Sequence, residues 1–438
     1  MSAKYSQGMD LTLDIERLGI NGEGVAHHNK MTIFVEGALP DEKVIATITE
    51  TRRTFQRAKI KKILIPSDYR VDPICPLFGT CGGCQIMHLS YEMQLLQKQK
   101  RVKDAFERIG KLNNITVHPT HPSPSQFEYR NKIALPLTKH LQLGLYKKGS
   151  HDIIPVDHCY IHTPLGEKAF SLVAKLIREK GLKEIKHVII RTAIKSNQLL
   201  IVLVTHKSLT PRLSSEVKSL YDEMDEIKGI IHNENSGHGN RIMGKKFTTI
   251  IGEGEIEDEI CSLRFKVSPS SFFQVNPLQA ELLYQKAIEL AEFSGSETLL
   301  DAYCGVGTLA LIASPFVKKV IGVECVAPAI ADAKQNAKLN NINNVSFFAD
   351  HAEDFIKKQK NLDIAFINPP RKGCDKSFLD SIIALSPKKL IYISCDPATL
   401  ARDLRILEDG GYQIHEAHPF DMFPQTSHVE CVVSLSKK

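Results

Sequence analysis

The second half of the chain alternates short apolar stretches with helical ones, and this alternation constrains the fold more than any other feature. Past residue 268, apolar runs at 298–303, 320–323, 345–349 and 362–367 are each followed by a segment of helical character. Strands that alternate with helices predict a mostly parallel, doubly wound sheet. In such a sheet ligands bind outside the carboxyl ends of the strands, so the residues after each apolar run are the first candidates for a site.

Glycines and polar residues follow those apolar runs in a pattern that suits one cofactor. The turn 304–308, Cys-Gly-Val-Gly-Thr, lies between a strand and a helix, where glycines let the backbone approach a nucleotide. Glu324 ends the next strand and could accept hydrogen bonds from both ribose hydroxyls, while Asp350 and His351 end the third, where an adenine would lie. Asn368 ends the fourth. The third glycine of a dinucleotide fingerprint is absent, so the set predicts S-adenosylmethionine; the alternative is that these are the solvent-facing ends of a generic sheet.

Two residues near the C-terminus form a candidate catalytic pair. Residues 391–394 are a fifth apolar run, which ends at Cys395 and breaks at an Asp-Pro step, so the thiol is expected at the lip of the cleft. Asp396 or Thr399 would cap the helix that follows. A thiolate is a strong nucleophile, and Glu430, at the start of the final predicted strand, is a candidate base. Considered alone, Cys395 is best interpreted as a buried, unreactive thiol and Glu430 as a surface acid. The presence of both residues indicates covalent catalysis.

Size and charge narrow the classes of function. A chain of 438 residues has room for two or three domains, and 56 Lys and Arg against 50 Asp and Glu give a net charge of +6, which identifies no partner by itself. The longest apolar run, residues 199–204, is far too short to span a membrane. Ten cysteines without an export signal predict a reducing, cytoplasmic location, in which thiols serve metal binding or catalysis.

The first 65 residues predict a small β-barrel with one basic stretch. Segments 11–15, 31–35, 44–50 and 57–63 have the character of short strands separated by Gly, Asn and Pro turns. Between residues 52 and 62 there are six cations and no acid: Arg52, Arg53, Arg57, Lys59, Lys61 and Lys62. On a small barrel such a stretch is typical of binding to single-stranded nucleic acid, although a solvated charged face has the same composition.

Three closely spaced cysteines predict a metal site. Cys75, Cys81 and Cys84 lie in a loop rich in Pro and Gly, and Cys159 is a fourth candidate far downstream. Such thiols indicate zinc or an iron–sulphur cluster, and their spacing alone does not separate the two. Zinc ribbons usually pair two Cys-x2-Cys knuckles, and the second knuckle is missing here, which favours a [4Fe–4S] cluster.

The middle of the chain carries a second candidate for RNA contact. Its predicted strands and helix lie at 186–191, 199–205, 228–233 and 165–180. The segment 127–137 is a further predicted strand with Tyr129, Arg130 and Lys132, a grouping that suits stacking on a base and pairing with phosphate. An ordinary half-exposed strand would carry the same residues.

Several motifs carry a resemblance to a known family. The N-terminal segment resembles a TRAM domain, an OB-like RNA-binding module, and CPLFGTCGGCQIMHLSYEMQLLQKQKRV resembles the cluster loop and following helix of the RNA uracil-5-methyltransferase family. DAYCGVGTLAL, SFFQVNP, SCDPATLARDL and HVE are similar to that family's cofactor and catalytic signatures. The branch most similar to this chain modifies 23S ribosomal RNA and has both a TRAM domain and a cluster. One motif departs, because Asn368 in NPPRKG stands where the family usually has an aspartate and cannot carry charge.

The resemblance implies an α/β multidomain protein. Its parts are an OB-like TRAM barrel at 1–65, an α+β central domain with an iron–sulphur cluster at 66–268, and a Rossmann-like class I methyltransferase domain at 269–438. The helix near 87–109 is expected to pack on the catalytic domain. The implied cluster ligands are Cys75, Cys81, Cys84 and Cys159, and the implied cofactor contacts are Gln274, Tyr303, Thr308, Glu324, Asp350, His351 and Asn368.

The resemblance also implies a reaction. Uracil C5 is too weak a nucleophile to take a methyl group from a sulphonium unaided. Addition of Cys395 to C6 makes C5 nucleophilic, and Glu430 then removes the C5 proton so that the thiolate can leave. The expected substrate is an unstacked uridine of RNA, most simply in 23S rRNA, and the product is 5-methyluridine; the T-loop uridine of tRNA is the alternative.

Two rival functions remain open from the residues. Asn368-Pro-Pro is also found in methyltransferases that act on nitrogen, but Arg371 replaces the aromatic residue that follows it there. A non-catalytic iron–sulphur protein that binds RNA would leave the cofactor motifs unused. We expect a monomeric enzyme that binds RNA and neither DNA nor membrane.

Overall fold

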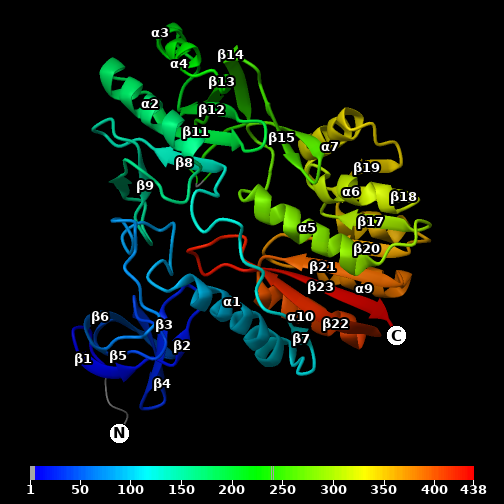
Figure 1. The fold of residues 1–438 in the computed structure, drawn as a ribbon, viewed down its shortest axis with the longest axis horizontal. Helices are drawn as coiled ribbons and strands as arrows, with labels where there is room; N and C mark the ends of the chain where they lie inside the picture. The colour runs from blue at the N-terminus through cyan, green and yellow to red at the C-terminus, as the bar shows by residue number, and fades with distance from the viewer. Residues whose placement is uncertain (1–4, 238, 240) are drawn as a thin grey trace.

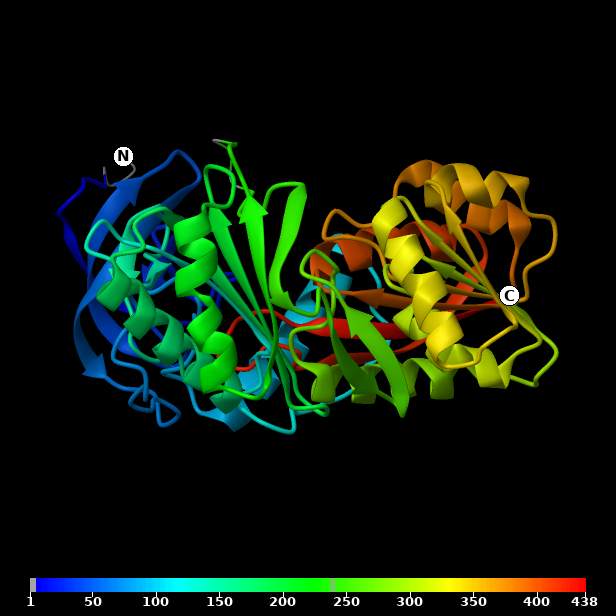
Figure 2. The same ribbon diagram turned by 90° about the horizontal axis from the view of Figure 1, so that it is seen from above.

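The computed structural model describes residues 5–237, 239 and 241–438, which form three regions of sheet with helices packed around them (Figure 1, Figure 2). The N-terminal region has six strands in the order β1-β5-β6-β4-β3-β2: β1 (Asp10–Asp14), β2 (Arg17–Leu18), β3 (Gly24–His28), β4 (Met31–Glu36), β5 (Lys43–Thr51) and β6 (Phe55–Ile65). Along β1 buried and exposed side chains alternate, and the buried ones join a separate core. Register shifts between β5 and β6 bend these strands, so the sheet curls as expected for a small barrel.

The central region is a five-stranded sheet covered by a long helix. Its strands, in the order β14-β13-β12-β11-β8, are β8 (Lys132–Pro136), β11 (Ile185–Ala193), β12 (Gln198–Thr205), β13 (Ile227–Glu234) and β14 (Lys246–Gly252). The helices are α2 (Pro164–Lys180), α3 (Pro211–Glu216) and α4 (Lys218–Glu223), and two hairpins, β9 (Gly144–Tyr146) with β10 (Ile153–Pro155) and β15 (Ile256–Ile260) with β16 (Leu263–Val267), flank the sheet. Thr163 caps α2, since its side chain accepts the Gly166 N–H. This sheet and α2 enclose a core of their own.

The C-terminal region is an eight-stranded sheet in the order β19-β18-β17-β20-β21-β23-β22-β7. Its strands are β7 (Thr116–Val117), β17 (Thr298–Ala302), β18 (Lys319–Glu324), β19 (Val345–Ala349), β20 (Ile364–Ile367), β21 (Lys389–Ser394), β22 (Tyr412–Phe420) and β23 (Glu430–Lys437). The helices are α5 (Pro277–Ala291), α6 (Thr308–Ala313), α7 (Ala327–Leu339), α8 (Ala352–Phe355), α9 (Lys376–Leu385) and α10 (Pro397–Asp409), with short 3₁₀ turns at Ser314–Phe316 and Ile356–Lys358. Two separate apolar clusters cover the sheet, so it is doubly wound as predicted.

A helix from the N-terminal half packs on this C-terminal sheet. Helix α1 (Tyr91–Ala105), with the π-helical turn Phe106–Gly110, lies against α10 and contributes Val102 to the same apolar cluster (Figure 1). Lys98 of α1 forms a buried ion pair with Asp421. Strand β7 follows the helix and pairs in parallel with β22. In the described part of the chain, no helix is long and apolar enough to cross a membrane.

Candidate active site

The carboxyl ends of the parallel strands bring the predicted cofactor groups to one edge of the sheet. Strands β19, β18, β17, β20 and β21 are parallel neighbours, so the residues that follow them share this edge. Tyr303 follows β17, Glu324 ends β18, Asp350 follows β19 and Asn368 follows β20. All four are partly exposed, so this edge is open to a ligand.

The turn after β17 requires glycine. Gly305 and Gly307 have φ angles of 55° and 82°, a region that favours glycine. A Cβ on Gly307 would lie 2.7 Å from Cζ of Phe347. The buried Thr308 begins α6 directly after this turn. Gly307 is therefore required for packing against Phe347, whereas a Cβ on Gly305 would meet no atom within 4 Å, so the turn is open at Gly305.

Glu324 and Asp350 differ in how free their carboxylates are. One oxygen of Glu324 accepts the Val326 N–H at 3.0 Å, and no described residue donates a hydrogen bond to the other. Asp350 forms a 2.7 Å ion pair with Lys358, which lowers the pKa of its carboxyl group. His351 beside it is exposed. Glu324 can therefore give an oxygen to a ligand directly, whereas Asp350 must share its carboxylate with Lys358.

Sequence reasoning missed a buried carboxyl group at this edge. Asp301, on β17, is 1% exposed, and its Oδ2 has no hydrogen-bond partner among the described residues. Burial raises the pKa of Asp301 to about 7, and the nearby Glu324 carboxylate adds to the rise. The signal that could have identified it is an acid inside an otherwise apolar strand, which is costly unless it serves a purpose.

Gln274 is held in place by the central region. The side-chain amide of Asn131 donates to the Gln274 carbonyl at 3.1 Å. Burial raises the pKa of Tyr284 of α5, the nearby Glu430 and Asp301 charges add to the rise, and the Gln274 side chain opposes it. Tyr284 therefore lies near Gln274 and both buried carboxyl groups.

Cys395 directly follows β21 and Glu430 begins β23, its antiparallel neighbour, so the two residues lie at the same end of this strand pair. Strands β21 and β23 pair so that Ser394 lies opposite Cys431, and one further step of this register places Cys395 opposite Glu430. Opposed residues of an antiparallel pair point to the same face, with Cβ atoms about 5 Å apart. Cys395 is partly exposed and Glu430 is 6% exposed. The thiol is thus at the surface of the cleft, with the carboxyl group beneath it.

Burial controls the protonation of this pair. It raises the pKa of Cys395 to about 11, to which the Glu430 charge contributes, and it raises the pKa of Glu430 to about 7. The exposed Arg371, in the loop after β20, opposes both increases. Thr399 of α10 donates a hydrogen bond to the Arg371 carbonyl at 3.3 Å, which joins this loop to the helix that follows Cys395. Arg371 is thus a positive group beside the pair, a role that the sequence did not suggest.

Polar contacts on both sides fix the position of Cys395. Asp396 Oδ1 accepts the N–H groups of Ala398 at 2.9 Å and Thr399 at 3.0 Å, so Asp396 is the cap of α10. The Asp396 N–H donates to Ser394 Oγ at 3.1 Å. These hydrogen bonds fix the backbone between the end of β21 and the start of α10. The position of the Cys395 thiol follows from this fixed backbone.

The four predicted metal ligands line one pocket. Cys75, Cys81, Cys84 and Cys159 surround a common cavity with largely apolar neighbours. Burial raises the pKa of Cys84 to about 12 and of Cys159 to about 11, and neighbouring thiols add to both increases. No three of these sulphurs, all in described residues, lie within 4.8 Å of one another. A tetrahedral zinc ion needs sulphurs about 3.8 Å apart, so these sulphurs as they stand are too widely spaced to hold a single zinc ion with three or four of them.

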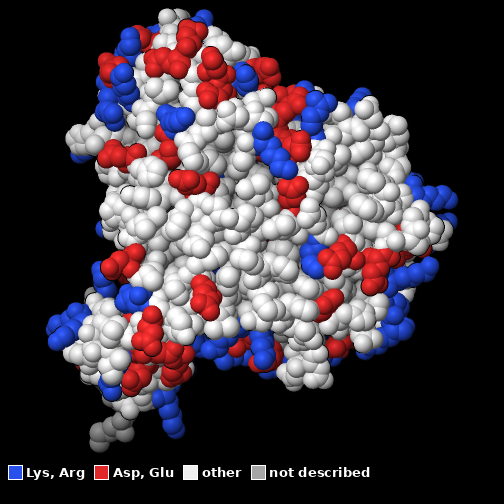
Figure 3. Space-filling model, viewed as in Figure 1, with Lys and Arg blue, Asp and Glu red and all other residues white. Residues whose placement is uncertain are grey.

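The cations between residues 52 and 62, before and along β6, are exposed and partly neutralised. Acids of β5 and β1 pair with three of them: Glu50 with Arg52 and Arg57, and Asp10 with Lys61. Arg53, Lys59 and Lys62 are exposed and form no ion pair with any described residue. On the face drawn in Figure 3, Lys and Arg alternate with Asp and Glu instead of gathering into one basic patch. The three unpaired cations could contact RNA directly, whereas Arg52 and Arg57 would first have to exchange Glu50 for a phosphate.

Tyr129 is part of the interior, so the expectation that its ring stacks on a base is wrong. Its side chain is 2% exposed, and its hydroxyl donates to the Pro424 carbonyl at 3.0 Å. The predicted strand 127–137 begins only at Lys132. Arg130 is half-buried, and burial, together with nearby cations, lowers the pKa of Lys132 to about 8. Lys132 can still reach an anion, but with less exposure than expected.

The sheet order, the glycine turn after β17 and the acid at the end of β18 define a Rossmann-like methyltransferase fold. A family model described as tRNA (uracil-5-)-methyltransferase matches residues 90–438, and a TRAM domain model matches residues 6–61. The chain belongs to the tRNA (uracil-5-)-methyltransferase family and is an RNA methyltransferase with an N-terminal TRAM domain. The resemblance to this family and to a TRAM domain found in the sequence is confirmed.

Individual relatives agree over the whole length. A Listeria innocua protein described as an uncharacterized RNA methyltransferase is 41% identical over 451 residues, covering 99% of each chain. A Clostridium acetobutylicum protein of the same description is 40% identical over 446 residues, covering 98% of this chain and 97% of its own. The crystal structure of Pyrococcus abyssi tRNA (uracil-54, C5)-methyltransferase with S-adenosyl-L-homocysteine has a TM-score of 0.79 and 26% identity, covering 97% of this chain and 100% of its own. Together with the family match, this neighbour supports S-adenosylmethionine as the cofactor.

Proposed function

We propose that this protein transfers a methyl group from S-adenosylmethionine to C5 of a uridine in RNA and so produces 5-methyluridine. The observation that carries the proposal is the cross-strand pair of Cys395 and Glu430 beside the cofactor edge. Methylation of a base nitrogen needs no thiol, whereas C5 of uracil must first be activated by a nucleophile at C6. The pair therefore favours carbon as the methyl acceptor.

In the proposed reaction, Cys395 gives its proton to solvent water as its sulphur bonds to C6 of the uracil ring. The C5–C6 double-bond electrons move towards C5 and O4, which makes C5 nucleophilic. When bound, S-adenosylmethionine supplies the methyl group that C5 takes. Glu430 then accepts the C5 proton, the C5–H electrons restore the double bond, and the S–C6 bond breaks to release Cys395 as a thiolate.

The protonation states suit these roles. A carboxyl group with a pKa of about 7 can accept and return a proton at neutral pH. A thiol with a pKa of about 11 is protonated at rest, so its proton must leave during the attack. Arg371 favours the anionic forms of both groups, and it would stabilise the thiolate when it forms and when it leaves.

The proposed cofactor site runs along the carboxyl edge of the sheet. Glu324 would accept the ribose hydroxyls, and the turn that ends at Thr308 would support the rest of the cofactor with its backbone. The remaining proposed contacts are Gln274, Tyr303, Asp350, His351 and Asn368. Asn368 is uncharged, so it would act through hydrogen bonds alone.

The proposed RNA target is 23S rRNA. This target is inferred from the TRAM domain combined with a [4Fe–4S] cluster held by Cys75, Cys81, Cys84 and Cys159, which would order the loop between the barrel and the central sheet. The proposed RNA contacts are Arg52, Arg53, Arg57, Lys59, Arg130 and Lys132. A tRNA T-loop uridine is the second candidate, favoured by the tRNA (uracil-54, C5)-methyltransferase neighbour.

Methyl transfer to defined RNAs tests this proposal. Purified protein, labelled S-adenosylmethionine and transcripts of 23S rRNA and of tRNA are incubated, and the nucleosides are then separated. We expect 5-methyluridine with the wild type and with a control variant, Cys261→Ser, and none with Cys395→Ser. Label on a nitrogen, or full activity of Cys395→Ser, would contradict the proposal. The transcript that is modified identifies the target.

A further inference from the structure

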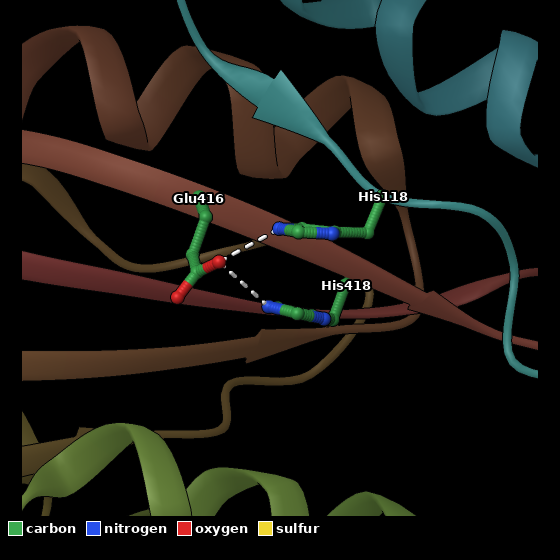
Figure 4. A group of neighbouring side chains, drawn as sticks. All are labelled: His118, Glu416 and His418. Carbon is green, nitrogen blue, oxygen red and sulfur yellow. Dashed lines mark hydrogen bonds and ion pairs between the residues drawn. The ribbon is translucent and has the colours of Figure 1, made fainter.

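Two histidines and a glutamate converge at the edge of the C-terminal sheet, outside the residues assigned above (Figure 4). His118 follows β7, and Glu416 and His418 lie on β22. The Nε2 atoms of both histidines approach the same carboxylate oxygen, Glu416 Oε2, at 2.7 Å from His118 and 3.2 Å from His418. The two imidazole rings are stacked, with centroids 4.2 Å apart and planes 9° from parallel.

We propose that His118, Glu416 and His418 bind a divalent transition-metal ion of the zinc type. Two imidazole nitrogens and one carboxylate are a ligand set that Zn²⁺ takes, with further positions left to water. The three ligand atoms all lie within 4.8 Å of one another. Around a tetrahedral ion with bonds of about 2.0–2.1 Å the ligand atoms are about 3.3 Å apart, so the spacing suits an ion, and the two stacked rings would tilt on binding so that both nitrogen lone pairs point at it.

His418 provides a second, independent observation. Its side chain is 8% exposed, and its Nε2 faces Glu416 but has no hydrogen bond of good geometry with any described residue. A buried ring nitrogen without a partner is costly, and a metal ion would satisfy it. The other nitrogen, Nδ1, lies 3.4 Å from Nε2 of His121. This contact is of the kind that orients a metal-bound histidine.

An ion at this place would join two segments that are far apart in the sequence. The His118 N–H donates to the Ala417 carbonyl at 2.9 Å, and the His121 N–H donates to the Pro419 carbonyl at 2.8 Å, so the segment 116–121 runs alongside β22. This segment connects α1 with the central region, and β22 pairs with the strand that begins at Glu430. The ion would fix this connection, a structural role that does not depend on methyl transfer.

Cobalt titration of the full-length protein tests the site. Co²⁺ serves as a spectroscopic probe for zinc sites, and nitrogen and oxygen ligands give it no thiolate charge-transfer absorption, which separates this site from the cysteines. We expect about one such ion per chain, displaced by Zn²⁺, and a higher Tm in its presence, because a ligand that binds only the folded state stabilises it.

Variants of β22 and its neighbour locate the ion. His118→Ala and Glu416→Gln, at side chains 37% and 34% exposed, should fold normally and lose both the spectrum and the Tm increase. His121→Ala should weaken binding by about 10–100-fold. The matched control is His415→Ala, whose exposed ring contacts Ser436, and it should retain the ion. No Co²⁺ spectrum of this type in the wild type, or an unchanged one in His118→Ala, would overturn the proposal.

Discussion

Replacement of Glu430 by Gln should stabilise the protein at alkaline pH. Burial raises the pKa of this carboxyl group from an ordinary value near 4.5 to about 7. The native state therefore prefers the protonated form, and the stability it contributes is complete below pH 4.5 and is lost as the pH rises through 7. One unit between the folded and unfolded pKa values is worth about 1.4 kcal/mol. By this relation the ionised carboxylate lowers the free energy of unfolding by about 3 kcal/mol above pH 8.

Glutamine has a similar shape and does not titrate, so Glu430→Gln removes this penalty. The stability difference between Glu430→Gln and the wild type should grow by about 2–3 kcal/mol between pH 5 and pH 8, measured by urea unfolding. Glu179→Gln, at an exposed position on α2, is the control and should show no such trend. A difference that stays constant between the two pH values would refute the raised pKa. In the wild type, methyl transfer should rise with pH through 7, because Glu430 acts as the base in its ionised form.

Three further predictions follow from the packing, the cysteines and the barrel. Lys98→Met leaves the buried Asp421 without its partner and should lower the free energy of unfolding by about 3–5 kcal/mol; a loss below 1 kcal/mol would show that the pair is not essential. Cys84→Ser should reduce the iron and sulphide content of the purified protein while Cys261→Ser does not, and equal iron in both would contradict the cluster. Lys59→Ala should weaken RNA binding and lower the salt slope by about 0.7; an unchanged slope would exclude a phosphate contact.

The parts of the fold that local pattern determines could be predicted from the sequence. The five parallel strands β17 to β21 lie close to their predicted ranges, because each apolar run is bounded by a turn and followed by a helix. The same pattern located the glycine turn and the strand-end groups Glu324, Asp350 and Asn368. Parallel strands share one carboxyl edge, so local elements were enough to bring these groups together.

The parts that depend on long-range pairing could not be predicted in this way. Strand β23 runs antiparallel between β21 and β22, and only this insertion places Glu430 opposite Cys395. Tyr129, Arg130 and Lys132 have the composition of an RNA-binding strand. The Tyr129 ring is nevertheless buried and bonded to the distant Pro424, a contact that local sequence does not reveal. Asp301 appeared to be one polar residue in a strand, and only its burial and its unpaired oxygen mark it as part of the site.

Covalent capture of the target RNA tests the central claim most directly. An RNA with 5-fluorouridine at the target position carries fluorine where Glu430 would otherwise remove a proton, so the bond between Cys395 and C6 should persist after methyl transfer. Mass spectrometry of the digested complex should find the RNA attached to the peptide that contains Cys395, only when S-adenosylmethionine is present, and also with the control Cys261→Ser. An enzyme that methylates the natural RNA yet forms no adduct with the fluorinated one, or forms it at another residue, would contradict the account.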